Sequence, residues 1–379
     1  MSELAWHQTY YDGEPCGKYA LLRADRGPAS DSDEYLRRMG DVGRALRQAE
    51  IRTILLAHGT FVGRDVMGVV SQMEAFFPNQ ARKLAGAIKQ FTDAMAGDVG
   101  NYPPDYVQRL EAGLNAAGGE PIAVRQFQWS GQNHHLGRAD GAVRLLDELL
   151  QSPDGRVLLW GHSHAGNVFA LLTHLLSGDR HRLRLFFRAA RPFYRWPGWK
   201  SGGSPHWLRV RAASRSAALP AIRQRLDMVT FGTPLRYSWN MDGCSRLLHV
   251  VHHVPQPSLP DYRAAFPPSM EAILAGNRGD FVQQVGIAGT NVMPNVLAWK
   301  SWLADRRFNQ LLQSGLRSHE LYQRLALGCR VADVGQTVLV DYQQPPSPIS
   351  QHLAGHAVYT RREWLLFHAE ETVRRLYGG

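Results

Sequence analysis

The sequence predicts an α/β fold in which a mostly parallel central sheet is covered by helices on both faces. Short apolar runs alternate with amphipathic helical patterns along most of the chain, which is the pattern of parallel strands joined by crossover helices. Several of the apolar runs end directly at glycine-containing turns. With 379 residues, 44% of them hydrophobic and 20% charged, the chain can bury a large core, and we expect one domain over residues 1–379.

The first half of the chain supplies the first four strands of this prediction. Periodicity and capping residues favour a helix over 31–49, a helical region over 66–119 that is interrupted by Pro78 and by the turn 100–104, and helices ending near 150 and 176. The expected strands are 18–22, 52–57, 121–129 and 157–160.

The second half continues the alternation with longer connections. The expected strands are 227–231, 247–252, 281–288 and 337–341, and the expected helices are 296–312 and 361–377. Leu365, Ala369, Val373 and Leu376 share one face of the last helix, so this helix should pack on the sheet.

The stretch 156–176 contains the most specific local pattern, R-V-L-L-W-G-H-S-H-A-G-N-V-F-A-L-L-T-H-L-L. A buried strand is followed at once by Ser163 and then by a helix, and small residues flank the turn at Gly161, Ala165 and Gly166. This matches the G-x-S-x-G nucleophile elbow, with Ala165 in place of the last glycine. A serine that merely caps the helix is the structural alternative.

Further motifs follow the other predicted strands at the ends where open α/β sheets place their sites. Together they resemble an α/β-hydrolase of the lipase and esterase type, and the resemblance extends from Ile51 onward. The end of the chain is similar to the DDHD-type intracellular phospholipases, and one strand is similar to class 3 lipases. The motifs are H-G-T-F (58–61), W-S-G-Q-N (129–133), G-H-S-H-A-G (161–166), T-F-G-T-P (230–234), V-D-Y (340–342) and G-H-A-V-Y (355–359).

This resemblance implies a catalytic site with Ser163 as the nucleophile and His356, after the last strand, as the base that takes its proton. The backbone N–H groups of His164 and Thr60 would form the oxyanion hole. We expect the side chain of His58 to brace its loop. Alternatives remain for the base and for the second oxyanion donor. The rival bases are His352, His252 and His253, and Phe61 is the alternative second oxyanion donor.

The resemblance places the acid of the triad after the penultimate strand, but no carboxylate occurs directly after residue 252. Asp261 is the nearest in the chain, and we predict it as the acid from chain order. Asp341, at the end of the last strand, is the next candidate, followed by Asp242 and Asp280. The turn ending at Asn291 has an amide where an acid could stand.

The segment 180–226 carries the whole basic excess of the chain, with eleven arginines, one lysine and no acidic residue, against a net charge of +10 overall. Because this segment follows the elbow helix, we predict a lid-like insertion that contacts an anionic membrane. A solvated loop is the alternative, and no nucleic-acid partner is expected because no such module is present. Aromatic residues alternate with the arginines, namely Phe186, Phe187, Phe193, Tyr194, Trp196 and Trp199.

These patterns predict a carboxylic-ester hydrolase acting on lipid or acyl esters, without a cofactor. The alternatives are a thioesterase or acyltransferase that uses the same serine, and an inactive hydrolase-fold binding protein that has lost its acid. The histidine pairs 162/164 and 134/135 lack the spacing of a zinc site. Three scattered cysteines and the absence of a signal pattern predict a cytoplasmic protein, peripheral to a membrane if the basic segment binds one.

Overall fold

The structure, a computed structural model, describes residues 5–8, 14–15, 17–30, 32–59, 102–152, 155–195, 204–216, 218–265, 270–287, 299–314, 316 and 318–378. These residues contain a seven-stranded sheet in which all neighbouring strands are parallel, in the order β1-β7-β6-β5-β4-β2-β3. The prediction of an α/β fold with a mostly parallel sheet is therefore confirmed. The strands are β1 Lys18–Arg23, β2 Ile51–Ala57, β3 Ala123–Phe127, β4 Arg156–His162, β5 Leu226–Phe231, β6 Arg246–His252 and β7 Gln336–Asp341.

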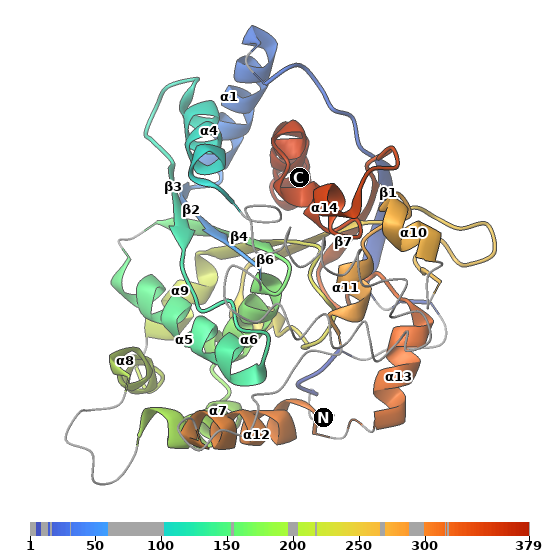
Figure 1. Cartoon of the computed structure of the whole chain (residues 1–379). Helices are drawn as coiled ribbons and strands as arrows, with labels where there is room; N and C mark the ends of the chain where they lie inside the picture. Colours follow the sequence, from blue (N-terminus) through green and yellow to red (C-terminus); the bar gives the residue numbers. More distant parts are fainter. Residues whose placement is uncertain are drawn as a thin grey trace.

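Helices cover both faces of the sheet (Figure 1). One face carries α1 (Asp33–Gln48), α4 (Pro104–Asn115) and α15 (Leu365–Leu376). The opposite face carries α5 (His135–Gln151), α6 (Ala165–Leu176) and α9 (Ala218–Gln224), and beyond them an outer layer of α7 (Arg180–Tyr194), α8 (Pro205–Ala213) and α12 (Trp299–Leu312).

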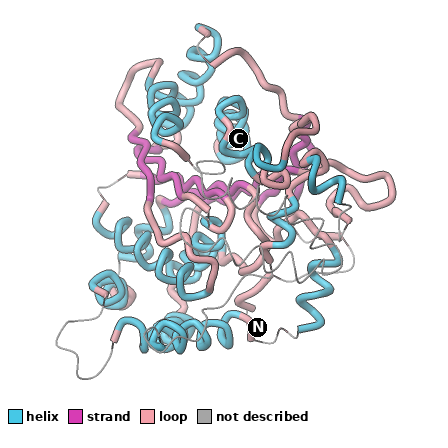
Figure 2. The backbone as a smooth tube through the Cα atoms, viewed as in Figure 1, coloured by secondary structure: helices cyan, strands magenta, loops and turns pink. Residues whose placement is uncertain are grey.

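Shorter elements lie in the connections near β6 and β7, where the tube in Figure 2 is mostly loop. They are the helices α10 (Met270–Ala275), α11 (Phe281–Val285), α13 (Ser318–Leu327) and α14 (Ile349–His352) and the 3₁₀ turns Met241–Gly243, Ala357–Thr360 and Arg362–Trp364.

The core consists of two apolar layers, one on each face of the sheet. Successive residues of a strand point to opposite faces, so Leu158 and Trp160 of β4 pack toward α15 while Val157 and Leu159 pack toward α5 and α6. All four side chains are buried. A parallel sheet that is covered on both faces needs such continuous apolar strands. This explains why polar and apolar residues do not alternate along β4.

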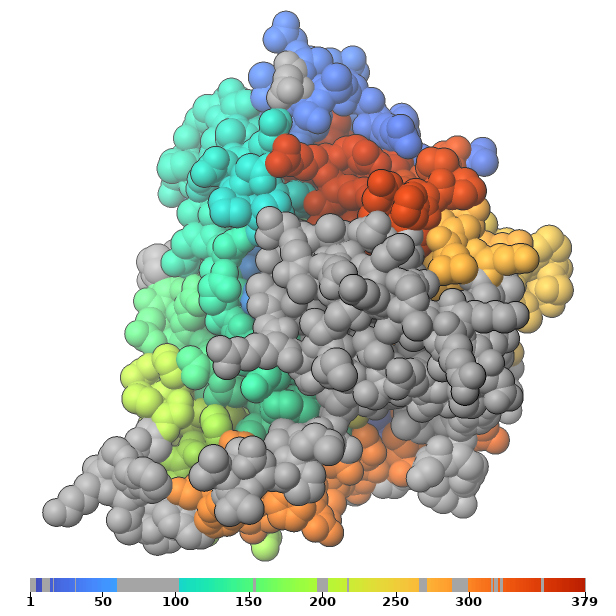
Figure 3. All heavy atoms as spheres, viewed as in Figure 1, coloured from blue at the N-terminus to red at the C-terminus, as the bar shows by residue number. Residues whose placement is uncertain are grey.

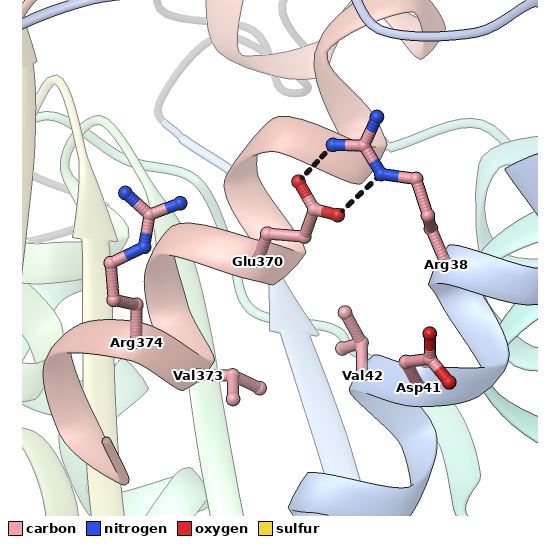
Figure 4. Close-up of a pocket in the computed structure, with 6 residues that line it drawn as sticks. All are labelled: Arg38, Asp41, Val42, Glu370, Val373 and Arg374. Carbon is pink, nitrogen blue, oxygen red and sulfur yellow. Dashed lines mark hydrogen bonds and ion pairs between the residues drawn. The ribbon is translucent and has the colours of Figure 1, made fainter. Parts of the chain in front are cut away.

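The helices α1 and α15, which lie near opposite ends of the chain, pack side by side on one face, and in Figure 3 the red C-terminal part of the chain lies directly beneath the blue N-terminal part. A bidentate ion pair joins them, since Arg38 Nε and Nη2 donate to the two carboxylate oxygens of Glu370 at 2.8 and 2.7 Å (Figure 4). In the sheet, β1 and β7 are parallel neighbours and likewise join the two ends of the chain. Both contacts join residues that are far apart in the sequence.

The strand order creates a switch point next to β4. From β2 the chain moves outward to β3, and it then returns past β2 to β4 on the other side. Connections that leave in opposite directions open a crevice at the carboxyl ends of such strands, which is where open α/β sheets bind their ligands. His58 and Gly59 follow β2 and Ser163 follows β4, so both segments lie at this crevice.

Two sequence predictions need correction in the connecting segments. The predicted strand at 281–288 is wrong over its described residues 281–287, because 281–285 form α11, whose first turn is capped by Asp280 Oδ1 accepting from the N–H of Gln283 at 2.8 Å. Residues 66–101 of the predicted helical region lie outside the described residues, whereas α4 is confirmed. No helix in the described ranges is both long enough and apolar enough to cross a bilayer.

The described residues of the basic segment lie mostly in the helices α7, α8 and α9. Its aromatic side chains Phe186, Phe187, Tyr194 and Trp207 are buried in the outer layer, where Phe186 packs edge-on against Phe308 of α12. Trp207 Nε1 also donates to Asp140 Oδ1 of α5 at 2.7 Å. These aromatic residues are therefore core residues, whereas most arginines of α7 are exposed and Arg182 is buried. Residues 196–203 lie outside the described part of the chain.

Candidate active site

Ser163 lies at the tip of a strained turn between β4 and α6. Its φ of 57° is in the left-handed region, which costs a residue other than glycine about 1–3 kcal/mol. The turn is held on all sides, because the N–H of Ser163 donates to Phe231 O at 2.8 Å and its carbonyl accepts from Thr233 Oγ1 at 2.8 Å and from Gly166 N–H at 3.1 Å. This is the backbone geometry that a nucleophile elbow requires.

The glycines around this turn are required by close packing. A Cβ at Gly161 would overlap the ring of Phe169, and one at Gly166 would overlap Thr233. Ala165 is buried without conflict. The substitution of alanine for the usual last glycine of the motif is therefore tolerated, because the close approach is made at Gly166.

His356 is paired with a carboxylate, but this carboxylate belongs to Asp280. His356 Nδ1 lies 2.7 Å from Asp280 Oδ2, and both side chains are buried. The hydroxyl of Tyr359 donates to the same oxygen at 2.9 Å, and Asp280 Oδ1 accepts from the N–H of Gln283 at 2.8 Å. The carboxylate is thus held in place by three donors on two elements.

The pKa of Asp280 is lowered below its ordinary value. Burial by itself would raise this pKa, but the charge and hydrogen bond of His356, the N–H of Gln283 and the charge of Arg330 outweigh it. Asp280 is therefore ionised at neutral pH. An ionised carboxylate at Nδ1 keeps the ring proton of His356 on Nδ1 and leaves Nε2 as the acceptor.

The two atoms that would exchange a proton are both without a partner. Ser163 Oγ and His356 Nε2 are buried and form no hydrogen bond within the described part of the chain. His162, which directly precedes Ser163, ties the two segments together, since its Nε2 lies 3.2 Å from the carbonyl oxygen of His356 and the two rings are 4.6 Å apart. Ser163 is only 1% exposed, so a substrate has to displace side chains to reach it.

His164 has the position expected of an oxyanion donor, as the residue directly before α6. Its N–H finds no acceptor in the ranges that the structure describes. The second predicted donor, Thr60, lies outside the described residues, as does Phe61. His58 braces its loop as expected, since its Nδ1 donates to Gly59 O at 2.7 Å.

The prediction of Asp261 as the partner of His356 is wrong. Asp261 lies in a surface turn, where its Oδ1 accepts from the hydroxyl of Tyr19 at 2.7 Å. Of the alternatives, Asp341 Oδ1 accepts from the N–H of Gln343 and Asp242 lies in an exposed 3₁₀ turn. Neither of them contacts His356.

The physical reason is the path of the chain after β6. The segment beyond β6 passes through Asp261 and then returns, so that the N–H of Asp280 donates to His252 O at 3.0 Å and Gly279 forms a bridge with His253. Asp280 therefore lies at the end of β6 in space although it is distant in the sequence. The signal that could have found it is the capping pattern D-F-V-Q at 280–283.

The rival histidines bond to the backbone or are buried as neutral groups. His252 Nδ1 contacts Gly355 O at 3.1 Å, and His352 Nε2 contacts Leu274 O at 3.0 Å. Burial lowers the pKa of His253 to about 3. Among the residues that the structure describes, no three His, Cys, Asp or Glu side chains are grouped so that they could hold a metal ion.

Comparisons with protein-family models, with curated proteins and with solved structures find no match to this chain. The site is therefore interpreted from its own geometry.

Proposed function

We propose that this chain is a serine hydrolase of the α/β-hydrolase type that cleaves carboxylic esters, with lipid or acyl esters as substrates. The observation that carries the proposal is the buried His356–Asp280 pair, together with a left-handed serine at a strand-to-helix turn. The order Ser163, Asp280, His356 along the chain is that of α/β-hydrolase triads. The resemblance of the motifs to lipases and esterases supports the same assignment.

In the proposed reaction, His356 Nε2 takes the proton of Ser163 while Oγ attacks the ester carbonyl carbon. The negative oxygen of the tetrahedral intermediate accepts from the N–H of His164, with Thr60 as the second expected donor. Asp280 stabilises the imidazolium that forms and keeps its orientation. The imidazolium then gives its proton to the departing alkoxide, which leaves an acyl group on Ser163.

A water molecule completes the cycle by the same route. His356 accepts its proton, the hydroxide attacks the acyl carbonyl, and the proton returns to Ser163 Oγ as the carboxylic acid is released. An alcohol or amine in place of this water would give acyl transfer, and a thiol leaving group would give thioester cleavage. Both remain alternatives on the same site. The binding-protein alternative rests on a missing acid, and the contact between Asp280 and His356 supports the hydrolase instead.

A fluorophosphonate probe tests this proposal directly because it forms a covalent bond only with an activated serine. We expect labelling of the wild-type chain, none of Ser163→Ala, and strongly slowed labelling of His356→Ala. A folded wild-type chain that does not react would contradict the proposal and favour a binding protein. Hydrolysis of p-nitrophenyl esters of increasing chain length then defines the acyl specificity.

We also propose that the outer face of α7 contacts an anionic lipid surface. Five arginines spaced three or four residues apart are exposed along this helix, and none of them forms an ion pair with a described residue. The spacing places them on one stripe of the helix. Trp299, which is 38% exposed at the start of the neighbouring α12, adds an aromatic side chain of the kind enriched at lipid interfaces. The five are Arg180, Arg184, Arg188, Arg191 and Arg195.

A further inference from the structure

A buried cluster of polar side chains beside the elbow takes no part in the proposed chemistry. It contains the guanidinium groups of Arg138, on α5, and Arg236, after β5, with the side chains of Tyr237 and His135 between them. Arg138 is 0% exposed and Arg236 6%. Arginine is rarely buried unless a counter-charge accompanies it, so two adjacent buried guanidinium groups require an explanation.

Arg138 has only neutral partners in the described part of the chain. Its Nη1 donates to the hydroxyl of Tyr237 at 3.1 Å, and its Nη2 donates to the side-chain oxygen of Asn133. Its Nε is buried and has no acceptor. A guanidinium group remains charged at every relevant pH, so this donor and its positive charge are unsatisfied in the structure.

Arg236 is also without an ion pair among the described residues. Its Nη1 donates to Ile287 O at 3.0 Å, and its Nη2 lies 3.1 Å from His135 Nε2. Burial, followed by the charges of the two arginines, lowers the pKa of His135 well below its ordinary value, so this imidazole is neutral. The carboxylate of Asp305 acts to raise the pKa of Arg236 and of His135, and it accepts from the N–H of Leu136 and lies 3.4 Å from His134 Nδ1. Among the described residues, two guanidinium charges therefore stand against the single carboxylate of Asp305.

This cluster is attached directly to the elbow. Thr233 Oγ1 donates to the carbonyl of Ser163, and the next residue, Pro234, accepts from Asn167 Nδ2 of the first turn of α6 at 3.1 Å. The N–H of Arg236 donates to the same carbonyl at 2.8 Å. The loop that supports the serine thus also positions Arg236, and the charges of Arg138 and Arg236 help to lower the pKa of His164, the residue directly after Ser163.

We propose that Arg138 and Arg236 form a binding site for a phosphate or carboxylate group and that this group belongs to the ester substrate, which makes the preferred substrate an anionic ester. The inference rests on the proposed hydrolase function. The free Arg138 Nε and the two positive charges match an oxyanion, which gives shorter and stronger hydrogen bonds to guanidinium than a neutral acceptor does. A small pocket of about 10 Å³, whose lining includes Arg236, Tyr237 and Gln313, lies on the Arg236 side of the cluster.

The first arm of the test measures binding without catalysis. Inorganic phosphate should raise the melting temperature of Ser163→Ala, and Arg138→Gln in the same background should abolish the rise. Arg144→Gln is the matched control, since Arg144 lies on the same helix and pairs with Asp140 at the surface. Equal stabilisation of all three variants by phosphate would contradict the site. An Arg138→Gln chain that melts well below the parent without phosphate would instead assign Arg138 a structural role and overturn the proposal.

The second arm assigns the anion to the substrate. We compare kcat/KM for p-nitrophenyl butyrate with that for mono-p-nitrophenyl glutarate, and for monoacylglycerol with that for lysophosphatidate. Arg236→Gln should lower kcat/KM for the two anionic esters by roughly 10- to 100-fold, the loss expected for charged hydrogen bonds, and change it for the neutral esters by less than about threefold. Equal losses on both classes would overturn the substrate assignment, and phosphate stabilisation without ester discrimination would leave only a free-anion site. Absence of probe labelling in the wild type would instead count against the hydrolase function itself.

Discussion

The side chain of Asp280 caps α11 with one carboxylate oxygen and holds His356 with the other. This double role, together with the hydroxyl of Tyr359, fixes the orientation of the carboxylate, because the helix backbone supplies one of its hydrogen bonds. It also explains why the acid lies so far along the chain from β6, since α11 has to begin at the point where the chain returns to the sheet.

Replacement of this acid gives the first prediction. Asp280→Asn should lower kcat by about 10³- to 10⁴-fold, because an amide no longer stabilises the imidazolium or fixes the ring proton on Nδ1. Asp261→Asn serves as the matched control and should stay within about twofold of wild type, since the carboxylate of Asp261 accepts from Tyr19 at the surface and not from His356. Rates of p-nitrophenyl ester hydrolysis measure both variants, and the reverse order of effects would identify Asp261 as the acid.

The packing of Gly59 against the serine gives the second prediction. A Cβ at Gly59 would lie 2.7 Å from Ser163 Cβ and 3.2 Å from Oγ, so Gly59→Ala should displace the nucleophile and lower kcat on the order of 100-fold. Gly40→Ala, whose Cβ would lie 2.9 Å from Ala117 Cβ, is a control of similar overlap on α1. The control should lose stability but keep its turnover per folded molecule, and equal activity losses in both variants would contradict the prediction.

At the level of the elements, Asp227 joins neighbouring strands at the amino end of the sheet. It is 0% exposed and accepts from Arg156 Nε and Nη2 at 2.7 and 3.0 Å and from the hydroxyl of Tyr377 at 2.9 Å. Arg246 of β6 lies 3.5 Å away. One carboxylate therefore connects β4, β5, β6 and the end of the last helix.

Loss of this carboxylate should be costly, because it leaves a partly buried arginine without its counter-charge. Asp227→Ala is expected to lower the free energy of unfolding by about 3–5 kcal/mol. Asp41→Ala, which removes exposed ion pairs with Arg37 and Arg44, should cost at most about 1 kcal/mol. Urea denaturation measures both values, and a loss for Asp227→Ala as small as that of the control would contradict this account.

The elements that could be predicted from the sequence are those with a strong local signal. An unbroken apolar run predicted β4, and the helical spacing of apolar residues after Ser163 predicted α6. The run at 281–288 is short and apolar, so periodicity alone could not distinguish a strand from a buried helix. The neighbouring cap, Asp280, decides in favour of the helix.

Contacts between distant segments could not be predicted from local patterns. Motifs identified Ser163 and His356 because each stands in a recognisable position relative to a strand. The acid could not be placed in this way, since its position depends on how residues 253–279 return to β6. The burial of the aromatic residues of α7 likewise depends on α12, which follows much later in the chain.

For the whole molecule, buried neutral histidines predict sensitivity to acid. Burial lowers the pKa of His174 to about 3, of His249 to about 4 and of His368 to about 3. The unfolded chain binds these protons below pH 6.5 whereas the folded chain does not, so stability falls as the pH falls from about 6.5 to about 4. Each such histidine contributes about 1.4 kcal/mol per pH unit within this window.

Thermal denaturation between pH 7.5 and 4.5 checks this prediction. His368→Gln should flatten the loss of stability below pH 6.5, because the unfolded variant has one group fewer to protonate. His181→Gln is the control, since His181 is exposed on α7 and should leave the pH profile unchanged. Identical profiles for the wild type and both variants would show that buried histidines do not govern acid unfolding.

The arginine stripe of α7 gives the last prediction. Replacing Arg184, Arg188, Arg191 and Arg195 by Gln should weaken binding to vesicles that contain anionic lipid by about 1000-fold, because each base near such a surface contributes about 1 kcal/mol. Replacing Arg37 and Arg44 on α1, which pair with Asp41, is the control. Co-sedimentation should also weaken with added salt. Equal binding of the wild type to neutral vesicles would refute this proposal.

The pairing of β1 with β7 bears on how the protein is made. A ribosome synthesises the chain from its N-terminus. The edge strand β1 therefore has no pairing partner until β7, the last strand of the sheet in sequence, has been made. His356 leaves the ribosome later still, after β7. A nascent chain that already contains Ser163 consequently lacks the imidazole that we propose activates it, so the proposed activity can arise only when the chain is almost complete.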